Sequence, residues 1–510
     1  MVLRWWFERG TMLAGAPRAA QLRVERDEWR QAAENIAAGG GRLLALWASR
    51  EPGGADVVHA AYLADPGLLV LHMPVLEGSV PGLEQVFPAA SRMQRAVADL
   101  SGVRANDPDQ RPWLRHAAWP ADFHPLVDAH TPPADSPPKL DDYAFVRVKG
   151  EGVHEIPVGP VHAGTIEPGH FRFSIVGEKV LKLEQRLGYA HKGIERRFMQ
   201  LPLADGHTLA ARVSGDSTVA FSWAYCQALE GIAESPIPAR AAWLRALALE
   251  MERIANHLGD LGALGNDAGF AFGLAQFSRL KELWLRASET AFGQRYLMDF
   301  IVPGGVRMEL AAIGSRQIAE TLEQIEAESE RLRTIYDEHA GVRDRFNGAG
   351  IVAPSLAARL GLIGLAGRAS GQQFDVRVDL PCAPYDQLAP KKMFRDQGDV
   401  AARVAVRFDE VKESARLIRV LLKHMPAGDH VAEVPVPPPG SRGIGLIEGW
   451  RGPVLLALEA GEEGTIRRCH PHDPSWQNWP VLEHAILGNI VPDFPLINKS
   501  FNLSYSGHDL

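Results

Sequence analysis

The densest group of residues with chemically useful side chains lies between residues 159 and 217. It contains His162 in a Gly-Pro-Val-His turn, Glu167 before Pro-Gly-His, and Glu195 at the end of Gly-Tyr-Ala-His-Lys-Gly-Ile-Glu. A histidine titrates near neutral pH and can transfer protons, and a carboxylate can transfer protons or bind a cation. Each motif taken alone is better explained as a turn or a helix cap with solvated charges. Only their order and spacing together indicate a site.

A second candidate is the run Cys469–Asp473, Cys-His-Pro-His-Asp, where thiol and imidazole ligands for a transition metal stand close together. Pro471 stiffens this run, and no second pair of ligands is evident elsewhere in the chain. The sequence therefore does not predict a metal site here. The other cysteines, Cys226 and Cys382, are most simply explained as small apolar core residues.

The composition is typical of a soluble globular protein of two or three domains, with 510 residues of which 23% are charged and 46% hydrophobic. A formal net charge of −8 gives no support for nucleic-acid binding. Three scattered cysteines favour a reducing, cytoplasmic setting. No stretch has the roughly 18 apolar residues of a membrane-spanning helix, and the first nine residues are too charged for a signal peptide.

Four prolines between residues 132 and 138 mark the clearest boundary, because they favour an extended backbone and stop helices. The sequence therefore predicts an α+β protein in three parts. These are a small α+β domain (residues 1–130), a Pro-rich linker (residues 131–140) and a large, mainly helical domain with small β-sheet elements (residues 141–510). In the small domain, helices are expected at 24–38 and 88–100, and strands at 42–47, 57–62 and 67–73.

The large domain is expected to open with strands and continue with long helices. Residues 238–261 give the clearest helix, because apolar side chains recur there at intervals of three and four. The other helices are expected at 277–292, 311–340 and 400–424, and strands at 144–148, 170–176 and 453–459.

A series of glycine-, proline- and charge-rich motifs runs through the large domain. In chain order they are Gly159–His162, Leu187–Glu195, Glu250–Leu258, Pro303–Val306, Gly371–Arg377 and Glu448–Gly452. In this order they resemble the family that joins nickel–iron hydrogenase large subunits with the 49-kDa subunit of respiratory complex I. The first 130 residues resemble, more weakly, the 30-kDa subunit of complex I. The fused order is that of the formate hydrogenlyase (group 4 nickel–iron hydrogenase) large subunits.

The resemblance fails where the family carries two pairs of metal-binding cysteines. Ser214 and Ser217 stand at the first pair, and Ser504 and Gly507 stand at the second. A nickel–iron site needs soft thiolates, whereas hydroxyls are harder and much less acidic. The resemblance therefore implies a cavity without nickel and iron, and no cofactor bound by this chain is expected except a possible quinone.

The resemblance also implies roles for individual residues around that cavity. His162 would stand at a quinone pocket and supply a proton. Glu195 would match a carboxylate that transfers protons in hydrogenases, and Glu167 would match one that binds a nearby magnesium ion there. Asp375 or Glu448 could supply a partner for a buried arginine. The hypothetical catalytic residues are His162, Glu195 and Arg212, and the hypothetical cofactor-binding residues are Glu167, Asp375, Arg377 and Arg451.

The first functional hypothesis is an electron-transfer subunit of a membrane-associated, complex I-like oxidoreductase, at the cytoplasmic face and without a membrane span of its own. The expected partners are an iron–sulfur subunit like the 20-kDa subunit of complex I and multi-spanning membrane subunits. The resemblance to NADH-quinone oxidoreductase subunits associates the chain with quinone binding and NAD binding, but no NAD is expected on this chain itself. The alternatives are a catalytic hydrogenase large subunit and a non-catalytic scaffold.

Overall fold

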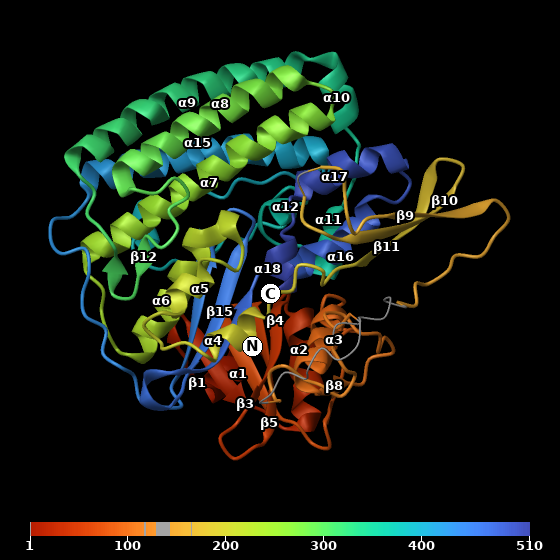
Figure 1. Cartoon of the computed structure of the whole chain (residues 1–510), viewed down its shortest axis with the longest axis vertical. Coiled ribbons are helices and arrows are strands. Elements are labelled where there is room, and N and C mark those ends of the chain that lie inside the picture. The colour runs from red at the N-terminus through yellow and green to blue at the C-terminus, as the bar shows by residue number, and fades with distance from the viewer. Residues whose placement is uncertain (1, 117–118, 129–142, 165) are drawn as a thin grey trace.

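The computed structural model describes residues 2–116, 119–128, 143–164 and 166–510. The predicted linker, residues 131–140, lies outside the described residues. In Figure 1 the N-terminal unit lies at one end of the molecule and a layer of long helices lies at the other. Strands from the C-terminal part of the chain run between them. The α+β class predicted from the sequence is confirmed.

The N-terminal unit is a five-stranded sheet with the strand order β1-β3-β6-β5-β4. Its helices α2 and α3 bury Trp29 and Met93. The predicted helices and strands of this unit are confirmed with boundaries shifted by a few residues. The elements are α1 (Val2–Arg9), β1 (Thr11–Met12), β3 (Ala19–Arg23), α2 (Arg26–Ala38), β4 (Arg42–Arg50), β5 (Asp56–Ala64), β6 (Gly67–Pro74), β7 (Ser79–Val80), α3 (Ala90–Ser101) and β8 (Arg104–Ala105).

A second sheet joins the two ends of the chain. Its order is β16-β15-β14-β2, and the short β2 (Ala14–Gly15) pairs in parallel with β14 (Arg442–Glu448). β15 (Pro453–Ala460) and β16 (Ile466–His472) complete it as antiparallel neighbours. The N-terminal residues therefore form part of the sheet that belongs mostly to the C-terminal unit.

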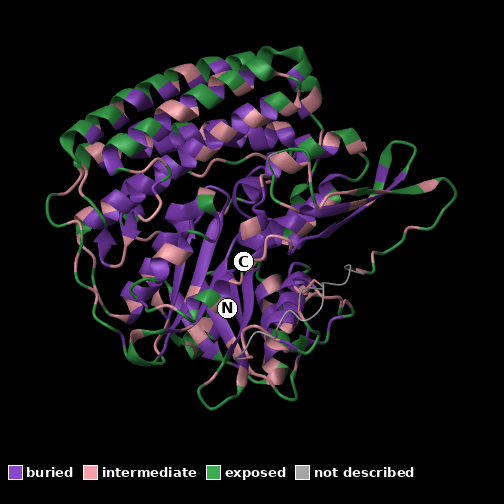
Figure 2. Ribbon diagram, viewed as in Figure 1, coloured by how far each residue is buried: buried purple, intermediate pink, exposed green. Residues whose placement is uncertain are grey.

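Four long helices form the layer at the top of Figure 1. They are α7 (Ala239–Asp267), α8 (Ala271–Phe292), α9 (Ala312–Glu338) and α15 (Val400–His424), and α7 contacts both α8 and α15. Figure 2 shows α7 mostly buried, while α9 alternates buried and exposed residues along its length. The helix predictions are confirmed, because the apolar spacing follows these burial patterns.

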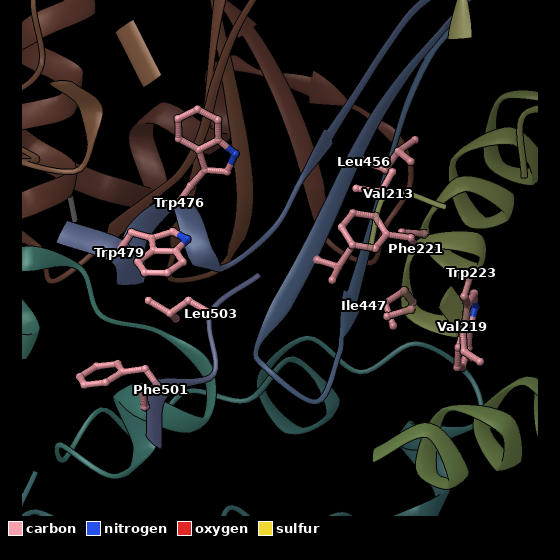
Figure 3. Packing of buried hydrophobic residues seen from close by; sticks show 14 of the residues in the cluster. Val213, Val219, Phe221, Trp223, Ile447, Leu456, Trp476, Trp479, Phe501 and Leu503 are labelled. Carbon is pink, nitrogen blue, oxygen red and sulfur yellow. The ribbon is translucent and has the colours of Figure 1, made fainter. Parts of the chain in front are cut away.

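Helix α6 (Thr218–Ile232) packs directly on the second sheet. Figure 3 shows Phe221 of α6 facing Ile447 of β14 and Leu456 of β15. A second group in the same hydrophobic cluster contains Trp476, Trp479, Phe501 and Leu503. Removing this apolar surface from water stabilises the packing of α6 on the second sheet.

The strand predicted at residues 144–148 is wrong. The Val146 N–H donates to the Glu184 carboxylate at 2.9 Å, and the Ala144 carbonyl accepts from Arg111 at 2.8 Å. The side chains of Glu184 and Arg111 thus bond to the backbone groups that would otherwise pair with a neighbouring strand. The three-stranded sheet here is β9 (Val153–Val158), β10 (His170–Val176) and β11 (Lys179–Arg186), in the order β11-β10-β9.

The remaining elements are short, apart from one helix of eleven residues that carries an internal proline. They are α4 (Ile194–Phe198), α5 (Gly206–Ala210), η1 (Gly215–Ser217), β12 (Ile301–Val302), β13 (Gly305–Val306), α10 (Ala340–Phe346), α11 (Pro354–Leu360), α12 (Gly364–Arg368), α13 (Val376–Asp379), α14 (Tyr385–Leu388), η2 (Glu462–Gly464), α16 (Ser475–Ala485), η3 (Val491–Asp493), α17 (Phe494–Phe501) and α18 (Tyr505–Asp509). Among the helices in the described part of the chain, none has the length and apolarity to span a membrane.

The close contact between α6 and β14 gives a test of the fold. A Cβ atom at Gly445 would lie 1.9 Å from the carbonyl oxygen of Ala224. We expect Gly445→Ala to lower the free energy of unfolding by about 1–3 kcal/mol, because backbone must move apart. Urea unfolding followed by circular dichroism measures this.

Gly53→Ala is the matched control, since a Cβ atom at Gly53 would meet nothing within 4 Å. Equal stability of the Gly445→Ala variant and the unaltered protein would contradict the contact between α6 and β14.

Candidate functional site

Two segments far apart in the sequence meet at one point. Ser214 lies directly before η1, and Ser504 lies directly before α18. Their hydroxyl oxygens are 2.8 Å apart, and both side chains are buried. The Ser504 hydroxyl also accepts a hydrogen bond from the Gly507 N–H at 2.8 Å. The two pairs of positions singled out in the sequence therefore converge, which no local pattern in the sequence could establish.

Asp473 occupies the space beside Gly507. A Cβ atom at Gly507 would lie 2.6 Å from Asp473 Oδ2, a separation that Cβ atoms essentially never show. Asp473 is fully buried, its Oδ1 accepts from the Ser475 N–H at 2.8 Å, and Oδ2 has no protein partner. Burial raises the pKa of Asp473. A larger side chain at Gly507 therefore requires this carboxyl to move.

An ion pair closes the other side of the serine pair. The Arg451 guanidinium binds Asp216 with two nitrogens, one of them at 2.7 Å, and donates to Ser217 Oγ at 3.3 Å. Burial opposes ionisation of Asp216, but Arg451 outweighs it and lowers the pKa of this carboxyl. Asp216 also accepts from the Ser214 hydroxyl at 2.8 Å.

A cavity of about 560 Å³ opens beside these residues, and we call it the site cavity. Glu167 contributes to its wall and accepts from the Ser506 N–H at 3.1 Å. Its lining contains charges of both signs and several amide and hydroxyl groups. The lining residues are Gly164, Ile166, Glu167, Ser214, Gly215, Asp216, Arg451, Pro495, Asn498, Lys499, Asn502, Leu503, Ser504, Tyr505 and Ser506.

Of the residues predicted for the cavity, Glu167 and Arg451 line it, and the three hypothetical catalytic residues do not. His162 is folded back on its own turn, with Nε2 2.8 Å from the Gly169 carbonyl oxygen. Arg212 pairs with Asp299 at the surface at 2.6 Å.

Glu195 lies away from the site cavity and is buried on α4. It accepts from Arg468 at 2.6 Å and lies 2.7 Å from His470 Nδ1. Burial alone would raise the pKa of Glu195, but Arg468 and His470 lower it to about 2. Its carboxylate is therefore held by two neighbours and does not face the Ser214–Ser504 pair.

Asp375 and Arg377 belong to a buried network of ions rather than to the lining of the site cavity. Arg377 donates to Asp375 at 2.7 Å and to Glu250 at 3.1 Å, which confirms Asp375 as a partner of Arg377. Glu448, the other predicted partner, accepts from Arg368 at 2.7 Å. Charges in this interior are paired, as burial requires.

The residues of the Cys469–Asp473 run turn to separate partners. His470 binds Glu195, while His472 lies 3.2 Å from the Gln477 side-chain oxygen. Cys469 is fully buried, and burial raises the pKa of its thiol. Across the described residues, no group of three or more histidines, cysteines, aspartates or glutamates is arranged to hold a metal ion.

Sequence reasoning missed the importance of Asp473 and Asp216. Asp473 appeared only as the end of a candidate metal motif, and nothing in the sequence places it against Gly507. The signal that could have identified Asp216 is its position between Ser214 and Ser217. The Glu448–Gly452 motif contains an arginine that could pair with it.

A smaller cavity of about 320 Å³ adjoins the same turn and also contacts Gly215 and Asp216. Glu252 of α7 lies in its wall and accepts from the Val219 N–H at 2.7 Å, at the start of α6. Burial raises the pKa of Glu252 to about 8, and Asp216 adds to this effect.

Comparison with known families matches both units of the chain. Residues 22–135 match the family described as the 30 Kd subunit of respiratory-chain NADH dehydrogenase. Residues 267–442 match the family described as its 49 Kd subunit. The order of the two matches along the chain is the fused order expected from the sequence.

Individual relatives are subunits of oxidoreductases. The chain is 30% identical to formate hydrogenlyase subunit 5 of Escherichia coli, over 84% of this chain and 76% of that protein. It is 31% identical to the carbon monoxide-induced hydrogenase of Rhodospirillum rubrum, over 68% of this chain and 97% of that protein. It is 26% identical to the C/D-type NADH-quinone oxidoreductase protein of Bacteroides fragilis, over 77% of this chain and 78% of that protein.

A solved structure is similar over most of its length. It is a chain of the membrane-bound sulfane sulfur reductase, an archaeal respiratory membrane complex. The TM-score is 0.67 at 25% identity, and the match covers 71% of this chain and 99% of that chain.

The residues at the serine pair do not fit a nickel–iron centre. Ser214 and Ser504 offer hydroxyl oxygens that bond to each other, and Gly507 offers no ligand atom. The carboxyl of Asp473 fills the space into which a side chain at Gly507 would extend. Nickel in such a site needs soft, deprotonated thiolates, so the donor set here is of the wrong chemistry.

The raised pKa of Glu252 predicts a pH dependence of stability. Its folded pKa of about 8 exceeds its ordinary value of 4.5. Between these values the unfolded state releases a proton that the folded state keeps, so stability falls as pH rises. We expect Glu252→Gln to remove up to about 1.4 kcal/mol of this fall per pH unit.

The measurement is the free energy of unfolding in urea between pH 5 and pH 8. Glu338→Gln, at the exposed end of α9, controls for the loss of one negative charge. The same slope in the unaltered protein and the Glu252→Gln variant would contradict a protonated Glu252.

Proposed function

The chain belongs to the family of fused 30-kDa-like and 49-kDa-like subunits found in complex I-like and hydrogenase-related membrane complexes, and we propose that it transfers electrons there without a metal centre of its own. The observation that carries the proposal is the Ser214–Ser504 hydrogen bond beside an open cavity. Ser214, Ser504 and Gly507 supply no thiolate, and a cavity of about 560 Å³ lies beside them.

The lining of the site cavity supports a small polar redox ligand such as a quinone headgroup. A carbonyl headgroup needs hydrogen-bond donors, and the wall offers the Asn498 amide and the Ser506 hydroxyl, whereas the Asn502 amide donates to Asp260. Glu167 and Arg451 place opposite charges in the same wall.

The proposed partners follow from the relatives. One relative is named a membrane-bound hydrogenase subunit, and the similar structure is from a respiratory membrane complex. We therefore expect an iron–sulfur subunit to bind next to the site cavity, and multi-spanning subunits to anchor the complex in the membrane. This chain would be peripheral, at the cytoplasmic face. The electron would come from the cluster of the iron–sulfur subunit.

A non-catalytic scaffold is the second candidate function. It is favoured by the Arg451–Asp216 ion pair, which satisfies two charged groups of the site cavity without any ligand. A scaffold needs only its outer surface, so changes inside the cavity would leave electron flow intact.

Glu167→Gln separates electron transfer from a scaffold role. This side chain is exposed to the cavity, and glutamine keeps its size and an acceptor for the Ser506 N–H. We expect electron flux through the purified complex to fall about tenfold, equivalent to ~1.4 kcal/mol of lost stabilisation. Glu338→Gln is the control, and both complexes must contain the same subunits. Unchanged flux in the Glu167→Gln complex would favour the scaffold.

The third possibility, an active hydrogenase subunit, is tested by hydrogen-dependent dye reduction with the native complex. We expect no reduction above the background, because the serine hydroxyls do not replace thiolates. Robust hydrogen-dependent reduction would overturn the proposal.

A further inference from the structure

Five histidines form a row between the two sheets, and most of them have no role in the proposed function. The ring centroids of His59 and His72 are 6.1 Å apart, and Trp47 stacks between His59 and His470 at 5.0 and 5.2 Å. His470 and His472 are 6.0 Å apart.

The row continues towards the serine pair through Trp476. Its ring lies 6.2 Å from His472 and 4.1 Å from His508. His508 is fully buried on α18 and lies 2.7 Å from the Asp509 carboxylate. β5, β6, β16 and α18 therefore all contribute histidines to one continuous row.

Two small cavities accompany this row. The outer cavity has about 40 Å³ and includes His59, His72 and Arg468 in its wall. The inner cavity has about 20 Å³ and includes Glu195, His470 and Arg468. A space of about 10–15 Å³ holds one water molecule when polar groups surround it. Both cavities are large enough for a water molecule, their exposed walls are mostly apolar, and Arg468 is a polar side chain that borders both of them.

Several buried polar atoms along the row have no protein partner. They are His470 Nε2, Trp476 Nε1, His508 Nε2 and Asp473 Oδ2, all in the stretch between the inner cavity and Gly507. Buried polar atoms are almost always hydrogen-bonded, to protein or to water. Water bound between these atoms would satisfy them.

The row has one end at the solvent and the other at the buried Asp473, behind the Ser504 wall of the site cavity. His72 is half-buried and also lines an open surface depression of about 590 Å³, together with Arg9, Arg23 and Arg442. At the other end, Asp473 Oδ2 faces Gly507, whose N–H donates to the Ser504 hydroxyl.

We propose that these histidines and the water between them form a proton path from the solvent at His72 to Asp473, behind the Ser214–Ser504 pair. At each histidine a ring nitrogen takes up a proton from water and releases one to the next water. At His470 and His508 this nitrogen is Nε2, because Nδ1 faces the Glu195 and Asp509 carboxylates. The net result is one proton taken from solvent and one proton delivered to the Asp473 carboxylate, and no electron moves along the path. Use of that proton in the site cavity rests on the proposed function.

The charges along the path are balanced. Burial lowers the pKa of His72 to about 4 and that of His472 to about 3, so both are neutral near pH 7 and can pass protons in turn. Arg442 faces His72 and is paired with Glu51 and Glu459.

Where the two cavities meet, Arg468 is paired with Glu195. At the inner end, His508 faces Asp509, with Asp473 and Arg92 near it. A proton crossing between the cavities therefore passes an ion pair rather than an isolated positive charge.

His72→Ala tests the entrance of the path, where a half-buried side chain can be removed with little effect on folding. We expect electron flux through the assembled complex to fall about 10²-fold, with an increased solvent isotope effect. Imidazole added to the buffer should restore the flux, which a purely structural defect would not allow. His424→Ala, at the exposed end of α15, is the control. Unchanged flux, or loss of flux without imidazole rescue, would overturn the path.

A second measurement does not depend on electron flux. Histidine-labelled full-length protein, studied by nitrogen-15 NMR, should show water contacts at the ring nitrogens of His59 and His470. Dry rings would overturn the path whatever the flux. If the unaltered complex carries no flux, the proposed function fails, and the NMR result alone decides the path.

Discussion

The buried network of ions between α7, α15 and β14 is the constraint on which the site depends. Its charges are almost completely removed from water, so each requires partners within hydrogen-bonding distance. Breaking one such pair typically costs about 3–5 kcal/mol. The network therefore fixes the relative positions of elements that are distant in the sequence. Its members are Glu250, Arg253, His257, Arg368, Asp375, Arg377, Glu410 and Glu448.

The network reaches the site cavity through the turn after β14. Arg253 donates to the backbone oxygens of Glu448 and Gly449 at 2.6 and 2.9 Å. The next residue, Trp450, donates from its indole to the Asp216 carbonyl at 2.8 Å. Arg451 then binds the Asp216 carboxylate. The turn that borders the site cavity is thus positioned by interactions among protein groups.

The sequence predicted the regular elements better than the site. The bounds of α15 at residues 400–424 were predicted correctly, because its apolar residues recur with helical spacing and Asp399 caps its start. The strand at 144–148 failed because side chains satisfy its backbone. The meeting of Ser214 and Ser504 was expected only from family resemblance. The approach of Asp473 to Gly507 depends on the tertiary packing of α16 against α18, which no local pattern records.

We propose above all that the site cavity beside the Ser214–Ser504 pair contains no nickel. The most direct measurement is anomalous X-ray scattering at the nickel absorption edge from crystals of the assembled complex. We expect no anomalous peak within bonding distance of Ser214, Ser504 or Asp473. A nickel peak among these three side chains would contradict it.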